Sequence, residues 1–257
     1  MTKLPTDYGP EVSTEPAAIP DKTIPLKGKY VTLTQWTQDY IPSLWQNVRV
    51  DPKLLIYMPA RDINTEQDLR EDLDGMQDHS DLICYAVMAD PKHLNPQAGD
   101  DVGGEHTDVV GLAFYGNFSA NDRVVEVGAM FAPVLHRTAA STEVHYLLLK
   151  NVLDDGSSIL SDGSPRYRRV AWKCNRLNVR SRNSAMRVGY VYEGTYRQAQ
   201  IIKGRSRDDD MFSMLDKEWP ISKAAMERWL DKNNWDGSGQ QVKKLQQIRA
   251  ELEKSSK

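Results

Sequence analysis

A carboxylate stands inside an otherwise apolar strand pattern in this chain. Side chains alternate along the run Val124–Phe131, and Glu126 shares a face with Met130. A carboxylate in a central strand costs free energy unless it is used in chemistry or paired with a cation. Arg123 and Lys173 are nearby candidates for such a partner. The sequence therefore leaves two roles open for Glu126, a proton acceptor or one half of a salt bridge.

A second candidate for chemistry is the segment His136–Glu143, which reads HRTAASTE and opens a predicted helix. The free N–H groups of a first helical turn and the helix dipole attract anions such as phosphate. Thr138, Ser141 and Thr142 add hydroxyl groups to those amides. The alternative is an ordinary N-capped amphipathic helix that binds nothing.

The longest informative stretch runs from Val170 to Pro220. It contains, in order, Asn178-x-x-Ser181-x-x-Ser184-Ala185, then Val188-Gly189-Tyr190 and Glu193-Gly194, followed by Lys203-Gly204-Arg205-x-Arg207-Asp208 and MFSMLDKEWP. This block resembles the signature of the GCN5-related N-acetyltransferases (GNAT), and within that superfamily the RimJ/RimL branch of ribosomal-protein alanine acetyltransferases. The match keeps its order and gaps over about fifty residues, and such a match seldom arises by chance.

The resemblance implies acetyl-CoA as cosubstrate and no metal. It implies that the main chain of Met130 and Phe131, at the end of a strand, contacts the pantetheine arm. It also implies that the following loop and helix start hold the pyrophosphate, through Arg137, Thr138, Ala139, Ala140, Ser141 and Thr142. Ala140 and Thr142 depart from the small glycines that are usual there.

The resemblance also assigns catalytic roles. Ser181 falls where this branch places a hydroxyl near the CoA sulfur, as general acid, and Asn178 contacts the cofactor or orders the loop. Glu126 corresponds to a carboxylate that takes the ammonium proton, directly or through water. Two alternatives remain. Ser181 could instead cap a helix over 182–188, and other branches use a tyrosine further along, near Tyr190 or Tyr192.

One departure concerns the acceptor. The ribosomal-protein branch can use a Glu in the strand after the Glu-Gly pair, but here that region reads Arg197-Gln198-Ala199-Gln200, and Gln cannot act as a base. We therefore predict transfer of acetyl to a primary amine of a small molecule, an amino acid or a protein N-terminus, with a slight preference for small molecules. A non-catalytic acyl-CoA-binding or regulatory module is the alternative.

Other kinds of chemistry find little support in the sequence. Cys84 and Cys174 fit no metal or redox spacing and are expected to be free thiols. His136 and His145 do not share a helical face, which argues against a metal site. No Gly-x-Ser-x-Gly elbow of a serine hydrolase occurs.

The elements that must position these residues follow from periodicity. Strands are predicted over 30–34, 82–88, 109–115, 124–131, 169–174 and 211–215, and helices over 39–48, 65–77, 139–153 and from Ser222 to Leu230. Asp208 is expected to support a hairpin, and Arg197, Arg205 and Arg207 to lie on its solvated edge. The predicted fold class is α+β: a mixed, mostly antiparallel GNAT sheet of about seven strands, splayed at the CoA site and flanked by helices.

Composition fits a soluble enzyme. The 33 Lys and Arg against 36 Asp and Glu give a net charge of -3, which calls for neither nucleic acid nor an anionic membrane as partner. We predict a flexible N-terminal tail (1–24), an acetyltransferase domain (25–235) and a polar, solvated C-terminal helix or tail (236–257). Loop 90–107 is a candidate lid. A cytoplasmic monomer or homodimer is expected, since no secretory signal or membrane span is recognisable.

Overall fold

The computed structural model describes residues 9–51, 53–58, 62–76, 79–94, 109–154, 165–236 and 240–255. The described strands form one sheet in the order β1-β2-β3-β4-β5-β6-β8-β7. The strands are β1 (Leu26–Lys27), β2 (Val31–Gln35), β3 (Leu82–Ala89), β4 (Val109–Ser119), β5 (Val124–Phe131), β6 (Arg169–Asn175), β7 (Val191–Ile202) and β8 (Arg205–Leu215). The helices are α1 (Ile41–Val48), α2 (Glu66–Asp72), α3 (Ala139–Leu153), α4 (Val179–Val188), α5 (Trp219–Leu230) and α6 (Leu245–Ser255).

The predicted α+β class and mostly antiparallel sheet are confirmed. Among the described strands, β5 and β6 form the one parallel pair, from Val124↔Arg169 to Val127↔Trp172. Beyond that point Gly128–Phe131 continue beside β4, whereas Lys173–Asn175 continue beside β8. The two strands therefore separate after Val127. We call this opening the splay.

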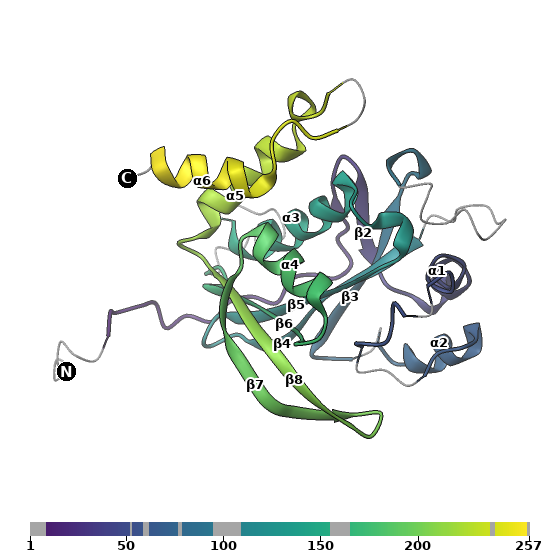
Figure 1. Cartoon of the computed structure of the whole chain (residues 1–257). Helices are drawn as coiled ribbons and strands as arrows, with labels where there is room; N and C mark the ends of the chain where they lie inside the picture. The colour runs from purple at the N-terminus through teal and green to yellow at the C-terminus, as the bar shows by residue number, and fades with distance from the viewer. Residues whose placement is uncertain are drawn as a thin grey trace.

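The two faces of the sheet have different neighbours. On β6, the ring of Trp172 contacts His145 of α3 and Tyr190, which follows α4. Because side chains alternate along a strand, Lys173 lies on the opposite face. We call these the α3 face and the Lys173 face. Figure 1 shows α3, α4, α5 and α6 gathered above the sheet, with α1 and α2 to its right.

Helix α3 is tied to the edge of the sheet by Glu143. This buried carboxylate accepts the backbone N–H groups of Lys29, Tyr30 and Val31, at 2.8, 2.6 and 2.9 Å. A side chain on Gly28 would collide with it, since a Cβ there would lie 2.3 Å from Oε2 of Glu143. The turn between β1 and β2 is thus fixed on the helix that begins beside the splay.

Helix α4 begins earlier than the sequence predicts. Its N-cap is Asn178, whose Oδ1 accepts the N–H of Ser181 at 3.1 Å. The prediction that Ser181 caps a helix over 182–188 is wrong, because Asn178 already satisfies that role one turn earlier. Gly189 ends the helix in a left-handed conformation (φ 115°), as its place in the sequence suggests.

Strands β7 and β8 form the long hairpin at the bottom of Figure 1. β7 is the edge strand, and its pairing with β8 shifts register twice, between Tyr192 and Gly194 and between Tyr196 and Gln200. Asp208 accepts the N–H of Gln198 at 2.8 Å, in agreement with its expected structural role. β8 is longer than the predicted 211–215 strand because the charged residues at 205–210 hide its alternation.

Two predictions near the C-terminus need correction. Helix α5 begins at Trp219, with Pro220 in its first turn, so the buried Ser222 lies inside the helix and does not cap it. Helix α6 is not merely solvated, because Leu245 and Ile248 are buried.

At the other end, Ala17 is buried and donates its N–H to Ala120 O at 3.0 Å, within the stretch predicted to be a flexible tail. Most of the loop predicted as a lid, 90–107, lies outside the described residues. None of the helices that the structure describes is long and apolar enough to cross a membrane.

Candidate active site

The edge of β5 that borders the splay presents main-chain groups that β6 does not pair with. A Cβ on Gly111 of β4 would lie 2.5 Å from Met130 O, so this carbonyl is directed at β4. Because successive residues of a strand present their backbone groups to opposite edges, those of Ala129 and Phe131 face the splay. The carbonyl of Phe131 is also bonded to Nε2 of His136 at 2.9 Å. Of the two residues that the sequence suggested, Phe131 faces the splay and Met130 faces β4; Ala129, which was not suggested, also faces the splay.

Helix α3 begins at the end of β5, after a short turn through Pro133–Leu135. Arg137 has a positive φ of 63°, and Thr138 is the N-cap, whose Oγ1 accepts the N–H of Ser141 at 3.2 Å. The first N–H groups of a helix have no intrahelical acceptor, so those of Ala139 and Ala140 remain for a ligand. Arg137 is exposed and Ala139 is partly exposed, whereas Ala140 is buried, so an anion would reach the helix end from the side of Arg137 and Ala139.

Two hydroxyl groups of this segment donate within the protein and the third is buried, contrary to their expected use as donors to a ligand. Thr138 donates to Leu135 O at 2.7 Å, and Ser141 donates to Thr138 O at 2.8 Å. The buried Thr142 accepts a hydrogen bond from Arg187 of α4 at 2.9 Å. Any anion held here would depend on backbone N–H groups and on Arg137.

Ser181 lies in the first turn of α4, beside the end of β6. Its Oγ accepts a hydrogen bond from Nε1 of Trp172 at 3.0 Å. Since the oxygen is the acceptor in that bond, the hydroxyl proton is directed elsewhere, and the Cys174 thiol lies within its hydrogen-bonding reach. Arg182 of the same turn is held by the fully buried Asp210 of β8, at 2.6 Å. This anchor, which the sequence analysis missed, fixes the start of the helix that carries Ser181.

The two tyrosines considered as alternatives to Ser181 are in different surroundings. Tyr190 is buried, and burial raises the pKa of its phenol well above the usual value. Tyr192 is exposed and its hydroxyl is bonded to that of Thr195 at 2.8 Å. Both cysteines are buried free thiols, and burial raises the pKa of Cys174. Cys174 therefore stays protonated and is a poor nucleophile.

Histidines near the site are neutral. Burial lowers the pKa of His145 to about 3, and the nearby cation of Arg187 acts in the same direction. Burial also lowers the pKa of His136, despite its bond to Phe131 O. Among the described residues, no group of three or more His, Cys, Asp or Glu could hold a metal ion.

Glu126 lies on the Lys173 face, on the last stretch of β5 that pairs with β6. Its Oε1 is 3.5 Å from Nζ of Lys173, and its Oε2 accepts a hydrogen bond from Nδ2 of Asn117 at 3.0 Å. Of the two partners the sequence suggested, Lys173 is the one in contact. The carboxylate is 19% exposed and can still be reached from solvent. Pairing with Lys173 therefore does not remove it from chemistry.

A neighbouring contact shapes the same face. A Cβ on Gly128 would lie 2.1 Å from the Phe114 ring, so this ring of β4 lies over Gly128. A side chain at this position would force the Phe114 ring to move. Phe114 forms an apolar wall beside Glu126, and the sequence gives no local signal for it.

Arg207 is not on the solvated edge where it was predicted. It is buried, its Nε is 2.6 Å from Oδ1 of Asp209, and it donates to Tyr57 O at 2.9 Å. The pair ties the segment after α1 to β8.

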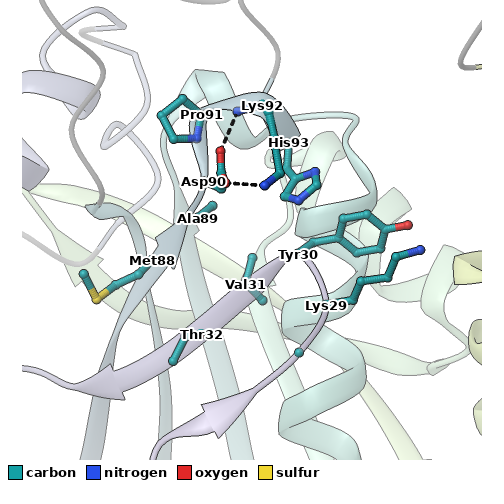
Figure 2. A pocket seen from close by; sticks show the side chains of 11 residues that line it. Lys29, Tyr30, Val31, Thr32, Met88, Ala89, Asp90, Pro91, Lys92 and His93 are labelled. Atoms are coloured by element: carbon teal, nitrogen blue, oxygen red, sulfur yellow. Dashed lines mark hydrogen bonds and ion pairs between the residues drawn. The ribbon is translucent and has the colours of Figure 1, made fainter.

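A separate pocket of about 580 Å³ lies away from the splay, between Gly28–Thr32 and Met88–His93. Figure 2 shows Tyr30 and His93 on one side of it, with Asp90 bonded to Lys92. The residues that line it include none of the predicted site residues, so we do not assign the chemistry to it.

Comparisons with known proteins agree with this geometry. No protein-family model and no curated protein sequence matches the chain. Among solved structures, it is similar to a GCN5-related N-acetyltransferase from Brucella melitensis, with 28% identity, a TM-score of 0.78, and coverage of 92% of this chain and 98% of that one. It is also similar to a probable acetyltransferase of the GNAT family from Chromobacterium violaceum, with 26% identity, a TM-score of 0.68, and coverage of 85% and 100%.

More distant structures share the fold. The acetyltransferase from Salmonella typhimurium that modifies the N-terminal serine of ribosomal protein L7/L12 is 14% identical, has a TM-score of 0.57, and the match covers 75% of this chain and 99% of that one. The splayed sheet, the helix start beside it and these similarities lead to one assignment: the chain belongs to the GCN5-related N-acetyltransferase superfamily and is an acyltransferase.

Proposed function

We propose that this protein transfers an acetyl group from acetyl-CoA directly to a primary amine in a ternary complex. The observation that carries the proposal is the splay, with an anion-accepting helix start at one end, Ser181 on the α3 face and Glu126 on the Lys173 face. When bound, acetyl-CoA supplies an activated acyl group as a thioester.

The residues present fit that cosubstrate. The N–H groups of Ala139 and Ala140, with Arg137, would hold the pyrophosphate, helped by the α3 dipole. The splay-facing main chain of Ala129 and Phe131 would hydrogen-bond the pantetheine arm. Met130, Thr138, Ser141, Thr142 and Asn178, also predicted as contacts, would act by fixing these elements.

Two of the proton transfers that the chemistry needs are assigned to side chains of the site, and the second amine proton, lost as the amide forms, restores the acid. An acceptor amine is protonated at neutral pH, so a base must remove a proton before nitrogen can attack, and we assign this to Glu126. The departing thiolate needs a proton, which we assign to the Ser181 hydroxyl. Trp172 supports that role because its N–H bond to Oγ stabilises negative charge on the oxygen.

The nature of the acceptor is a finer question. A solved structure with the same fold, the microcin C7 self-immunity acetyltransferase MccE, was obtained with acetyl-CoA and AMP. RimL, another, acts on ribosomal protein L7/L12. We infer that the acceptor here is a small molecule, an amino acid or a protein N-terminus, and that the protein acts in the cytoplasm as a RimJ/RimL-like enzyme, either a monomer or a homodimer.

The proposal is tested by following thiol release from acetyl-CoA against amines, amino acids and short peptides. Ser181→Ala and Glu126→Gln should each lower kcat by about a hundredfold or more. Both variants should keep the thermal stabilisation by acetyl-CoA, because neither removes a proposed phosphate contact. Ser206→Ala, at an exposed position on β8, is the matched control.

Each result has a distinct meaning. Acetyl-CoA that fails to stabilise the parent chain would contradict the cosubstrate assignment. Full activity in both variants would leave the fold assignment in place and refute the catalytic roles.

A further inference from the structure

An ion pair between Lys173 and Glu126 lies on the Lys173 face beside the splay, and both groups can form further hydrogen bonds. Nζ of Lys173 is 3.5 Å from Glu126 Oε1, a loose contact, and an ammonium group has three donors to offer. The Lys173 and Glu126 side chains are 27% and 19% exposed, so both charges can be reached by a small solute. The pair presents one positive and one negative group side by side.

The carboxylate of this pair is held from a second strand. Asn117 of β4 donates to Glu126 Oε2 at 3.0 Å. Asn117 has a positive φ of 49° and lies where the β4–β5 register shifts, between Gly116 and Ser119. Since Asn117 fixes one oxygen, Glu126 can keep its orientation when a ligand competes for Lys173.

The position of the pair relates it to the acceptor. Glu126 is one residue before the last β5–β6 register pair, and Lys173 is the first residue of β6 after that pair. The Phe114 ring over Gly128 borders the same place from β4. An amine that reaches the splay across this face therefore meets Glu126 and Lys173 together.

We propose that Lys173 and Glu126 select acceptors in which the reactive amine stands next to a carboxylate, as in an α-amino acid. The acceptor's ammonium would face the Glu126 carboxylate, and its carboxylate would face the Lys173 ammonium, so that each charge of the acceptor is paired with one of opposite sign. This rests on the proposed function, in which Glu126 takes the amine proton. The neutral nitrogen then forms the N–C bond, the C–S bond breaks, and the thiolate receives the proton of Ser181. The second amine proton, released as the amide forms, restores the Ser181 hydroxyl.

A lone amine is the disfavoured alternative. Its ammonium would approach Glu126 with the Lys173 cation close by and with no anion of its own to balance that charge. Like charges at this distance disfavour binding of the ammonium form. Free amino acids should therefore be better acceptors than their C-terminal amides, which keep the amine and lose the carboxylate.

The experiment compares kcat/KM for α-amino acids and for the matching C-terminal amides in the parent, Lys173→Gln and Lys173→Arg. The parent should prefer the free acids, and Lys173→Gln should lower that preference about tenfold, the effect of one partly exposed charge contact. Lys173→Arg should restore it, and Lys232→Gln, an exposed lysine away from the splay, should leave it unchanged. An equal rate for acids and amides in the parent would overturn the inference and leave the acetyltransferase proposal intact.

A binding measurement decides the matter without turnover. Thermal stabilisation of the parent by free amino acids, larger than that by the amides and lost in Lys173→Gln, supports the selection even if no acetyl transfer is seen. If the acids and amides stabilise the parent equally, or not at all, the selection by Lys173 is refuted. Absence of thiol release with every acceptor counts against the proposed function alone.

Discussion

At the scale of single residues, the candidate site depends on a few bonds between groups that lie on different elements. Trp172 is the clearest case. Its indole packs against the rings of His145 and Tyr190 on one side, and its N–H holds Ser181 Oγ. The Trp172 side chain thus both packs in the core and orients the Ser181 hydroxyl.

Trp172→Phe separates these two functions. The variant keeps an aromatic ring but loses the donor, so kcat should fall by about 2- to 10-fold, the value of one hydrogen bond. Stabilisation by acetyl-CoA should persist. Steady-state kinetics against the parent and Ser181→Ala provide the measurement. If Trp172→Phe keeps the parental kcat while Ser181→Ala lowers it, the Ser181 hydroxyl does not depend on the hydrogen bond from the indole.

His145 predicts a pH dependence of stability. Burial holds its folded-state pKa at about 3, whereas the value for an unhindered histidine is 6.5. Below about pH 6.5 the unfolded chain binds a proton that the folded chain refuses, so the free energy of unfolding should fall by about 1.4 kcal/mol per pH unit, until pH approaches 3. Above pH 6.5 this contribution is complete and constant.

Urea denaturation of the parent and His145→Phe between pH 7.5 and pH 5 checks this dependence. The difference in unfolding free energy between them should change with pH by the amount that one proton requires. His79→Gln, at an exposed position, should keep the parental slope. Identical slopes in the parent and His145→Phe would mean that His145 takes up its proton in the folded state.

At the scale of elements, helix ends decide where the site residues stand. Asn178 starts α4, Gly189 ends it, and Thr138 starts α3. Gly189 adopts a φ of 115°, and a Cβ there would lie 2.6 Å from Ser222 Oγ. Gly204, in the β7–β8 turn, also has a positive φ (70°), but a Cβ there would meet nothing within 4 Å.

These two glycines form a matched pair for measuring backbone strain. Gly204→Ala should cost about 1 kcal/mol of stability, because only the left-handed conformation is penalised. Gly189→Ala should cost about 2–4 kcal/mol, since the contact with Ser222 adds to the strain. In Gly189→Ala combined with Ser222→Ala, part of that excess should return. Equal costs at both glycines, measured by chemical denaturation, would exclude the contact as a cause.

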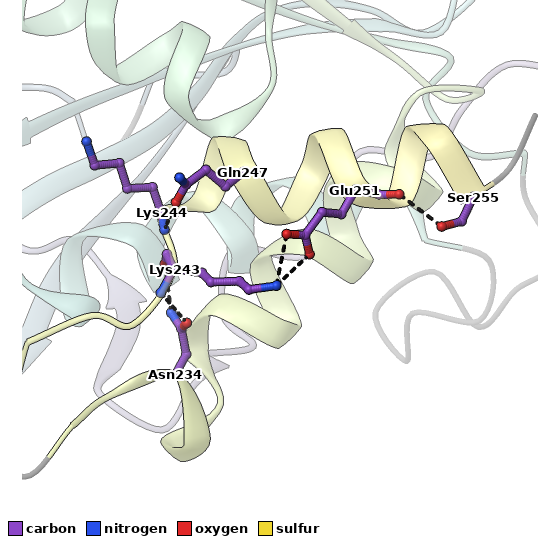
Figure 3. A network of polar contacts seen from close by, with 6 residues as sticks. All are labelled: Asn234, Lys243, Lys244, Gln247, Glu251 and Ser255. Atoms are coloured by element: carbon purple, nitrogen blue, oxygen red, sulfur yellow. Dashed lines mark hydrogen bonds and ion pairs between the residues drawn. The ribbon is translucent and has the colours of Figure 1, made fainter.

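At the scale of the whole molecule, the C-terminal helix α6 takes part in the structure around the site. Figure 3 shows its beginning tied back to Asn234, which accepts the N–H of Lys243 at 2.9 Å, and Lys243 paired with Glu251. Arg249 of α6 donates to the carbonyls of Arg187 and Met186 at the end of α4, at 3.0 and 3.1 Å. Arg187 in turn holds Thr142 in α3.

Arg249→Met should therefore lower the free energy of unfolding by about 1–3 kcal/mol, because the last carbonyls of α4 lose a charged donor. Lys254→Met, in the exposed last turn of α6, should have little effect. Thermal unfolding of both variants checks the difference. Equal stability of the two would mean that water replaces Arg249 without cost.

How much of this could be predicted depends on how local each signal is. The bounds of α3 and β5 follow from neighbouring residues, and the sequence predicted them. The bond from Trp172 to Ser181 and the ring of Phe114 over Gly128 depend on how separate elements meet, and spacing does not encode them.

The same limit explains the errors. Asn178 and Ser181 are both good capping residues, so composition alone could not choose between them. The charged residues of β8 made this strand hard to recognise in the sequence. Two of them, Asp209 and Asp210, are buried, and they pair with Arg207 and Arg182, respectively. From the sequence alone, a buried charged residue with an ion-pair partner cannot be distinguished from a charged residue on the surface.

The irregular edge strand β7 has a consequence for how this protein behaves at high concentration. A regular exposed edge can recruit a strand from another molecule and so start an aggregate. Here Ile201 and Tyr196 are 82% and 64% exposed, which would make such recruitment favourable. The register shift at Tyr196–Gln200, with Gln198 in a left-handed conformation, interrupts the row of hydrogen-bonding groups that a second chain would copy. The bulge in β7 therefore opposes edge-to-edge association between folded molecules.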